Sequence, residues 1–127
     1  MKRKIADIPF VPYANWDANG VQMSCEPSPK DIQRAIDDKQ FEQRGFQTHY
    51  DELKAEWERN VSSAQEWNER VRAYHTKRIA HFVVQGWSDP IILNANGTMK
   101  DGLHRFKAAI FMGKDEVDVT ISDKDST

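Results

Sequence analysis

The chain contains a single cysteine, Cys25, among its 127 residues, so a framework of disulfide bonds is excluded. It has no apolar run near the roughly 20 residues that cross a bilayer. Residues 1–4 are basic, but no apolar segment follows them as one would in a signal peptide. These absences predict a cytoplasmic protein that does not enter a membrane.

An excess of positive charge is also lacking. Lys and Arg total 18 against 20 Asp and Glu, and the net charge is −2. Proteins that bind duplex DNA usually cluster basic residues, because the release of counterions from phosphates supplies much of their affinity. The charge balance therefore argues against stable binding to duplex DNA.

The second half of the chain predicts a β-hairpin. Residues 90–93 are continuously apolar, as in a strand that is buried on both faces. Asn96 and Gly97 follow, and this pair supplies the positive φ angles that a tight turn requires. Residues 98–100 would form the returning strand.

A helix and a last strand are predicted after the hairpin. Leu103, Phe106 and Ile110 recur at spacings of three and four residues, and Gly113 is placed to end the helix. Residues 117–121 alternate between apolar and polar, so one face of this strand packs inward. The predicted order is strand, turn, strand, helix, strand, which is an α+β arrangement.

The junction between the second strand and the helix reads Asp-Gly-Leu-His-Arg at residues 101–105. Unpaired N–H groups in a helix's first turn, with the positive end of the helix dipole, favour a bound anion. His104 and Arg105 would add charge-assisted donors, so the junction predicts a phosphate site. Two alternatives remain open: Asp101 caps the helix, and Arg105 pairs with Asp101 or with a C-terminal acid such as Asp118.

These segments together resemble the ParB/sulfiredoxin superfamily, in particular its ParB N-terminal-like domain. The resemblance runs from about residue 78 onward. It is carried by Asp-Pro-Ile-Ile-Leu at 89–93, Asn-Gly at 96–97, Asp-Gly-x-His-Arg at 101–105, Ala-Ala at 108–109 and Gly113. The resemblance implies a small mixed sheet around the strand-turn-strand-helix-strand core, with a long helical insertion ahead of it.

Members of this superfamily bind ATP or CTP with the phosphates at this helix start, so the resemblance implies ATP or CTP with Mg²⁺ as cofactors here. The residues implied to contact the nucleotide are Gly102, Leu103, His104 and Arg105. Asp101 would hold the metal, and Asp101 and His104 would be the catalytic residues. The superfamily includes chromosome-partitioning proteins, sulfiredoxins, free-serine kinases and proteins described as nucleases.

Sulfiredoxin chemistry is excluded by one residue. Sulfiredoxins place a nucleophilic cysteine directly before the His-Arg pair, and this chain has Leu103 there. Cys25 lies far away in the sequence, and we interpret it as a structural or incidental cysteine.

The middle of the chain predicts helices. Ser28 suits an N-cap, Pro29 the first helical position and Asp31 the third, and Gly45 is a plausible stop. Residues 46–74 then carry an apolar and aromatic stripe with an average period of about 3.5, typical of a long helix in a coiled coil or helix pair. The stripe consists of Phe46, Tyr50, Leu53, Trp57, Val61, Ala64, Trp67, Val71 and Tyr74. It either packs on the shorter helix and the core, or forms a surface for a partner protein or a second copy of the chain.

Two further segments frame the predicted core. Residues 75–87 predict a helix that Gly86 ends, with Lys77 and Arg78 either facing the phosphate site or solvated. Residues 5–19 contain two prolines and alternate loosely, as in an edge strand followed by irregular chain.

We predict one domain over residues 1–127. It divides into an N-terminal strand and irregular segment (1–27), a helical extension (28–75), the core (76–122) and a tail (123–127). The predicted function is binding of a nucleotide or another phosphorylated small molecule, with metal-dependent phosphotransfer, nucleotide hydrolysis or nuclease activity if the protein is an enzyme. The alternative is a non-catalytic protein that binds a partner through the stripe. The small size and the helical insertion would suit a gene carried by a phage or plasmid.

Overall fold

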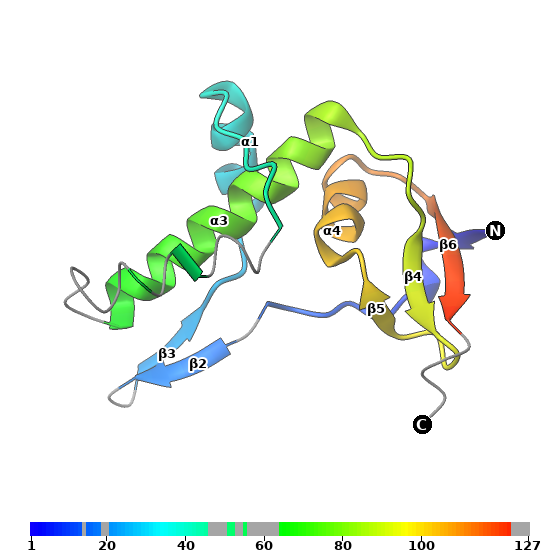
Figure 1. The fold of residues 1–127 in the computed structure, drawn as a ribbon, viewed down its shortest axis with the longest axis horizontal. Coiled ribbons are helices and arrows are strands. Elements are labelled where there is room, and N and C mark those ends of the chain that lie inside the picture. Colours follow the sequence, from blue (N-terminus) through cyan, green and yellow to red (C-terminus); the bar gives the residue numbers. More distant parts are fainter. Residues whose placement is uncertain (14, 19–20, 46–50, 53–54, 56–63, 123–127) are drawn as a thin grey trace. The chain divides into compact units, whose positions relative to one another are not determined.

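A computed structural model describes residues 1–13, 15–18, 21–45, 51–52, 55 and 64–122. In chain order its elements are β1 (Lys2–Lys4), the 3-10 turn η1 (Ile5–Asp7), β2 (Asn15–Ala18), β3 (Val21–Ser24), α1 (Pro29–Asp37), α3 (Ala64–Gln85), β4 (Ile91–Asn94), β5 (Met99–Asp101), α4 (Leu103–Phe111) and β6 (Glu116–Ser122) (Figure 1). The chain divides into two compact units. The first combines Met1–Val11 with Phe82–Thr127, and the second is Pro12–His81.

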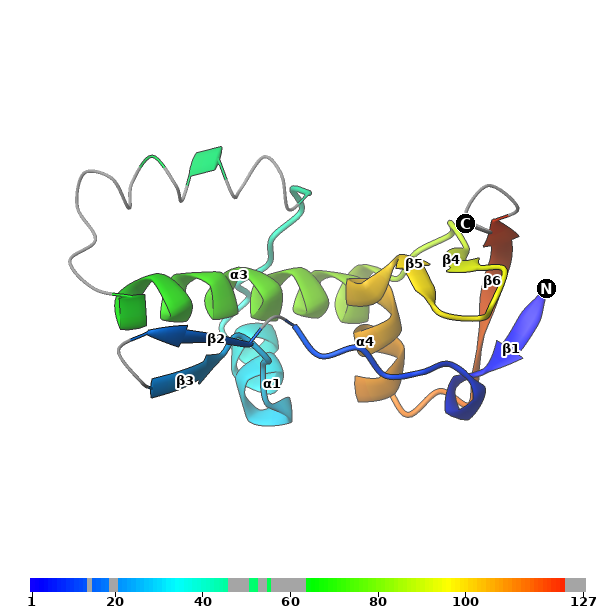
Figure 2. The ribbon, with the colours of Figure 1, turned by 90° about the horizontal axis from the view of Figure 1, so that it is seen from below.

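The first unit is built on a four-stranded mixed sheet with the strand order β1-β6-β4-β5. β6 runs parallel to β4 and antiparallel to β1, and β5 is antiparallel to β4. α4 lies against one face of this sheet (Figures 1 and 2). The predicted α+β class and the order strand, turn, strand, helix, strand are confirmed.

The core of the first unit follows from the alternation of residues in its strands. Val117 and Val119 of β6 are buried, and the residues that flank them are exposed, so one face of this strand packs inward as predicted. α4 contributes Phe106 and Ala109 from one side of the helix. The buried cluster consists of Ile8, Ile91, Leu93, Phe106, Ala109, Val117 and Val119.

The buried face of α4 agrees with the predicted one at Phe106 and differs from it at Ile110 and Lys107. Ile110 was expected on it but is 40% exposed, whereas Lys107 is only 5% exposed. The small side chains of Ala108 and Ala109 allow close approach, and the contact face is centred on them. The Lys107 ammonium lies 4.8 Å from the centroid of the Phe10 ring, a cation–π contact.

Gly113 ends α4 as predicted. Its N–H donates to the Ile110 carbonyl at 3.0 Å, and the Lys114 N–H donates to the Ala109 carbonyl at 3.0 Å. These two bonds form a Schellman motif, in which the residue after the helix adopts a left-handed conformation. Gly113 has a φ of 73° and no Cβ to oppose that conformation.

The turn between β4 and β5 is looser than predicted. Four residues, 95–98, lie between the strands, and the Asn94 N–H donates to the Thr98 carbonyl at 2.8 Å, which closes a loop of residues 95–97. Only Gly97 in this loop has a positive φ, of 89°. The Gly97 N–H donates to the Asn94 carbonyl at 2.9 Å. This pattern is typical of a three-residue hairpin loop with glycine in the left-handed position, so the prediction of positive φ at Asn96 is wrong.

The N-terminal prediction was wrong about where the edge strand lies. β1 is formed by Lys2–Lys4, ahead of the predicted residues 5–19, and it pairs with β6 in the register Arg3 to Val117. Residues 15–18 instead form β2, which pairs with β3 in a separate two-stranded sheet. The sequence carries a signal for this hairpin, a second Asn-Gly pair at 19–20 between two short apolar segments.

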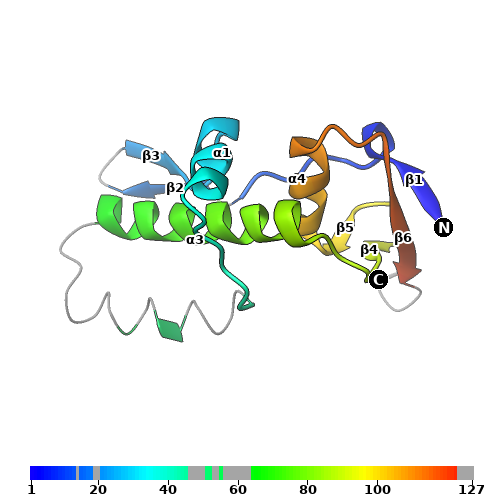
Figure 3. The ribbon, with the colours of Figure 1, turned by 90° about the horizontal axis from the view of Figure 1, so that it is seen from above.

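In the second unit, α1 and the β2–β3 hairpin both lie beside α3 (Figures 2 and 3). α1 begins with the predicted signals. The Ser28 side chain accepts a hydrogen bond from the Asp31 N–H at 3.1 Å, and Asp31 Oδ2 accepts one from the Ser28 N–H at 2.9 Å. Pro29 takes the first helical position. The predicted helix start is confirmed as a capping box.

α1 ends at Asp37, well before the predicted stop at Gly45. Lys39 adopts a left-handed conformation with a φ of 57°. The N–H groups of Lys39 and Gln40 donate back to carbonyls of the last turn at 3.1 and 2.8 Å, respectively. A lysine therefore occupies the left-handed position after the helix, where glycine is usual. No residue type at this position in the sequence predicted the helix end.

α3 runs without a break from Ala64 to Gln85. The two helices predicted to meet near residues 75 and 76 are therefore one element over this range. Gly86 follows with a φ of 73°, and its N–H donates to the Phe82 carbonyl at 2.8 Å, so the predicted helix end is confirmed.

Within the described chain, no helix is both long and apolar enough to span a membrane. The single-domain organisation stays a prediction.

Candidate functional site

The predicted phosphate site, residues 101–105, lies where β5 leads into α4. The register of β5 against β4 shifts by one residue, which leaves Lys100 as an extra residue in its strand. Such a bulge turns the chain locally. Asp101 is the last residue of β5, and Gly102 follows as the N-cap of α4.

Gly102 is required at this junction for two separate reasons. Its φ is 102°, a conformation that side chains other than hydrogen oppose. A Cβ at this position would lie 3.0 Å from Arg105 Nη2 and 3.2 Å from Ile91 Cγ1, closer than Cβ atoms usually approach, so these side chains would have to shift. The residue is also buried. The backbone therefore comes close to the Arg105 guanidinium only because position 102 has no side chain.

The first turn of α4 presents backbone donors. The helix's first internal hydrogen bond joins the Phe106 N–H to the Gly102 carbonyl at 2.8 Å. The N–H groups of Leu103, His104 and Arg105 lie ahead of that bond, and the N-cap Gly102 has no side chain to accept a hydrogen bond from them. Three successive N–H groups and the helix dipole give this end a positive potential, which suits an oxyanion.

Arg105 is half-buried and makes hydrogen bonds that the sequence did not indicate. Its Nη1 donates to the carbonyl oxygens of Asp89 and Pro90, at 3.0 and 3.3 Å. The alternative that Arg105 pairs with Asp101 or Asp118 is therefore wrong, and the Asp118 carboxylate instead lies 3.2 Å from Lys2 Nζ. Through these hydrogen bonds, Arg105 connects the chain that precedes β4 to the first turn of α4.

Asp101 is exposed, and His104 is half-buried as the second residue of α4. The alternative that Asp101 caps the helix is wrong, because the N-cap is Gly102, which makes no side-chain hydrogen bond. Among the described residues no group of three or more His, Cys, Asp or Glu could hold a metal ion. A Mg²⁺ ion at Asp101 would then take its other ligands from phosphate oxygens and water, which is usual for this metal.

The basic pair before the core has a different role from the predicted one. Arg78 Nη1 donates to the backbone carbonyl of Gln43 at 2.5 Å and to that of Glu42 at 3.4 Å. Lys77 lines a cavity within the second unit. The structure therefore gives Arg78 backbone partners on the chain that follows α1, where a phosphate contact had been considered.

The aromatic stripe is described only in part. Val71 and Tyr74 are 9% and 1% exposed, and the Tyr74 hydroxyl donates to the Arg44 carbonyl at 3.1 Å. These two residues pack within their own unit, which is the first of the two predicted interpretations. Trp67 is half-buried. Trp57 lies outside the described residues, so a partner surface over 46–74 stays a prediction.

A buried polar cluster in the second unit was not foreseen. Cys25 Sγ donates to Asn68 Oδ1 at 3.1 Å, and Asn68 Nδ2 donates to the Ser24 carbonyl at 3.1 Å. The rings of Tyr13 and His75 stack with centroids 3.8 Å apart. Asn68 and His75 are seven residues apart on α3, a spacing that places both on one helix face and could have indicated the cluster. Cys25 is buried by these contacts, which agrees with a structural role.

Two cavities of about 200 and 190 Å³ are described, and neither is lined by residues 101–105. The predicted site is therefore a helix end at a strand junction rather than one of these cavities.

Comparison of the chain with protein-family models, with curated proteins and with solved structures gives no match.

Proposed function

We propose that the protein binds the phosphate groups of a nucleotide, ATP or CTP, at the first turn of α4, as its resemblance to the ParB/sulfiredoxin superfamily implies. The observation that carries the proposal is Gly102. Its left-handed conformation lets the chain turn directly from β5 into α4, and as the N-cap it has no side chain that could cover the N–H groups of the first turn. An oxyanion at that position would meet several donors at once.

The neighbouring side chains supply the rest of the site. Arg105 uses Nη1 for two carbonyl groups, and a guanidinium has further N–H donors that a phosphate could engage. His104 would add a donor from the second position of the helix. Asp101 would hold Mg²⁺ together with the phosphates, and Mg²⁺ would neutralise charge that develops on a transferred phosphoryl group.

A titration followed by NMR tests the proposal. Inorganic phosphate, ATP and CTP are added to the full chain with and without MgCl₂, while the backbone amide signals of residues 103–105 are recorded. We expect saturable shifts of these amides, strongest with a nucleotide. Signals that remain in place, or that move in proportion to ionic strength alone, would contradict phosphate binding.

Substitutions separate binding from packing. Arg105→Ala should lose roughly 1.5–3 kcal/mol of nucleotide affinity and should also lower the free energy of unfolding, because the Asp89 and Pro90 carbonyls lose their donor. His104→Ala should lower affinity with a smaller effect on stability. Lys2→Ala, which removes an exposed cation of the same unit, should change neither quantity.

Asp101→Asn tests catalysis. If the protein turns a nucleotide over, this variant should keep metal-free binding and lose the Mg²⁺-dependent rate. Unchanged turnover in Asp101→Asn, or full activity in excess EDTA, would exclude metal-assisted chemistry at this residue.

A further inference from the structure

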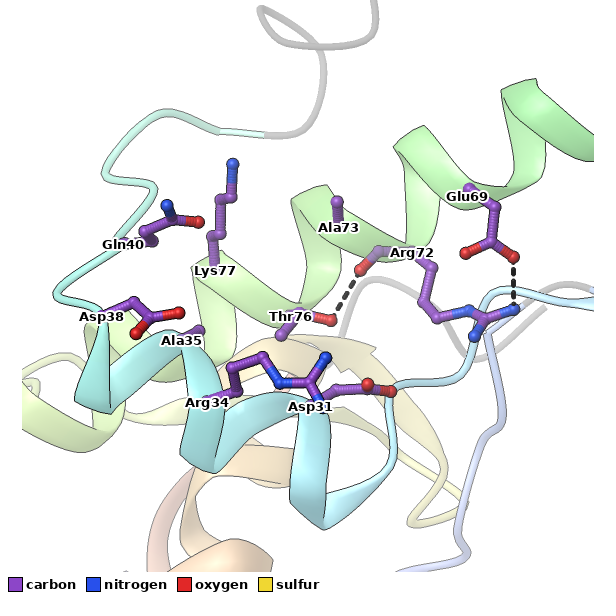
Figure 4. Close-up of a pocket in the computed structure, with 10 residues that line it drawn as sticks. All are labelled: Asp31, Arg34, Ala35, Asp38, Gln40, Glu69, Arg72, Ala73, Thr76 and Lys77. Atoms are coloured by element: carbon purple, nitrogen blue, oxygen red, sulfur yellow. Dashed lines mark hydrogen bonds and ion pairs between the residues drawn. The ribbon is translucent and has the colours of Figure 1, made fainter.

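The second unit contains a cavity of about 200 Å³ between α1 and α3, shown in Figure 4. It belongs to a different unit from the proposed phosphate site. Charged side chains of both signs line it: Arg34, Arg72 and Lys77, and Asp31, Asp38 and Glu69. The formal charges cancel, so the partners that these groups already have determine what the cavity attracts.

Two of the three carboxylates are engaged within the protein. Asp31 Oδ2 accepts a hydrogen bond from the Ser28 N–H at 2.9 Å, and Glu69 Oε1 accepts one from Arg72 Nη2 at 2.8 Å. The pKa of Asp31 is lowered chiefly by the Ser28 backbone bond and also by the nearby charges of Arg72 and Arg34. Asp38, at the C-cap of α1, is the carboxylate of this cavity for which no partner is described.

The cationic side chains have more hydrogen-bond donors without a partner than the carboxylates have acceptors. Arg72 Nε is buried and has no hydrogen-bond partner. The side chains of Arg34 and Lys77 make no hydrogen bond or ion pair with a described residue. A buried donor without an acceptor is costly, and a bound acceptor would remove that cost. The cavity therefore offers more unused donors than acceptors.

The unused donors and the Asp38 carboxylate lie at different ends of the cavity. In Figure 4 the guanidinium of Arg34 points toward the end that holds Arg72, Asp31 and Glu69, and Asp38 lies at the opposite end with Gln40 and Lys77. Because Asp31 and Glu69 already accept hydrogen bonds within the protein, the Arg34 end retains donors for a carboxylate, and the Asp38 end retains an acceptor for a group that donates a hydrogen bond. The volume is below the roughly 300–1,000 Å³ of sites for drug-sized ligands, which restricts the occupant to a small molecule.

We infer that this cavity binds a small carboxylic acid that also carries a hydroxyl or ammonium group, with the carboxylate on Arg34 and Arg72 Nε and the donor group on Asp38 and Gln40. The cancelling formal charges favour a ligand of net charge zero or −1 over a dianion such as phosphate.

Three probes of equal carbon number test this assignment on the full chain: propionate, lactate and alanine, each at constant ionic strength against sodium chloride. The readout is the side-chain Nε–Hε signal of Arg72 in an ¹H–¹⁵N NMR spectrum. We expect a saturable shift with lactate or alanine and weaker binding of propionate, which lacks the donor group. The comparison of lactate with alanine shows whether the hydroxyl or the ammonium group is preferred.

Matched variants localise the effect. Arg34→Gln should weaken binding about tenfold, because one charge-assisted bond is lost. Ala73 is exposed at the rim of the cavity, and Ala73→Leu adds apolar bulk there without a change of charge and should weaken the saturable shift. Lys30→Gln, on α1 but outside the cavity lining, should bind as the natural chain does. Each variant's amide spectrum verifies that it is folded.

The inference is overturned if all three probes shift the Arg72 signal no more than sodium chloride does, or if Ala73→Leu and Arg34→Gln bind as well as the natural chain. Inorganic phosphate serves as a further arm. Phosphate shifts confined to the Leu103 and His104 amides would leave the proposed phosphate site intact whatever happens at Arg72. Shifts confined to Arg72 with lactate or alanine would support the cavity, and only the phosphate arm tests the other site.

Discussion

At the scale of single residues, Gly102 determines whether the junction between β5 and α4 forms. Gly102→Ala should lower the free energy of unfolding by about 2 kcal/mol or more, because the left-handed φ costs about 1–2 kcal/mol and the new Cβ meets Arg105 and Ile91. Urea unfolding at neutral pH measures the loss.

Gly113→Ala is the matched control for Gly102→Ala. Gly113 also has a positive φ, but no atom lies within 4 Å of its ideal Cβ position. The Gly113→Ala variant should lower the free energy of unfolding only by the cost of the left-handed backbone conformation, about 1 kcal/mol. An equal loss of unfolding free energy in both variants would show that the close contact between Gly102 and Arg105 does not contribute to stability.

At the scale of elements, the end of α1 is strained because Lys39 adopts a left-handed conformation. Lys39→Gly should raise the free energy of unfolding by about 0.5 kcal/mol, since relief of the strain exceeds the added flexibility of the unfolded chain. Asp37→Gly, in the last turn of the same helix, should instead lower it by about 0.5–1 kcal/mol. Thermal or urea unfolding of both variants measures the contrast, and a loss of stability in Lys39→Gly would contradict the reading of its φ as strain.

The start of α1 should make stability depend on pH. The hydrogen bond from the Ser28 backbone lowers the pKa of Asp31 below its usual value of 3.8. A lowered pKa in the folded state stabilises the protein above pH 3.8, and this contribution is lost as the pH falls toward the folded-state pKa. Asp31→Asn should therefore flatten the acid limb of a plot of stability against pH.

Ser28→Ala separates the cap from the charge of Asp31. It removes the side-chain cap but keeps the Ser28 backbone N–H, so it should cost about 1 kcal/mol and retain most of the acid limb. An acid limb unchanged in Asp31→Asn would contradict the assignment of the pH effect to this residue.

At the scale of the whole molecule, the first unit needs both ends of the described chain. β1 pairs with β6, and Ile8 is 4% exposed within the core cluster. A fragment of residues 76–127 lacks both, and the loss of Ile8 burial alone costs about 2–4 kcal/mol of a typical margin of about 5–15 kcal/mol. We expect this fragment to show the poorly dispersed NMR spectrum of an unfolded chain.

Ile8→Ala in the full chain is the control for the fragment. It keeps β1 and should unfold cooperatively at a lower urea concentration than the natural chain. A fragment 76–127 that unfolds as cooperatively as the full chain would contradict the requirement for the N-terminal strand.

The sequence by itself determined the features that depend on neighbouring residues. The capping box of Ser28 and Asp31, the helix stops at Gly86 and Gly113, and the alternation along β6 all involve groups a few positions apart. Their geometry is set by backbone sterics and by the periods of helix and strand, which any local segment carries. For the same reason the order of strand, turn, strand, helix and strand could be predicted.

The tertiary structure alone decided the features that depend on distant partners. β1 joins β6 across more than a hundred residues, and the Arg105 guanidinium selects the Asp89 and Pro90 carbonyls rather than a carboxylate. The cavity between α1 and α3 likewise exists only because two helices distant in sequence lie side by side. A side chain's partner depends on which surfaces the fold brings together, and short-range periodicity contains no information about that choice.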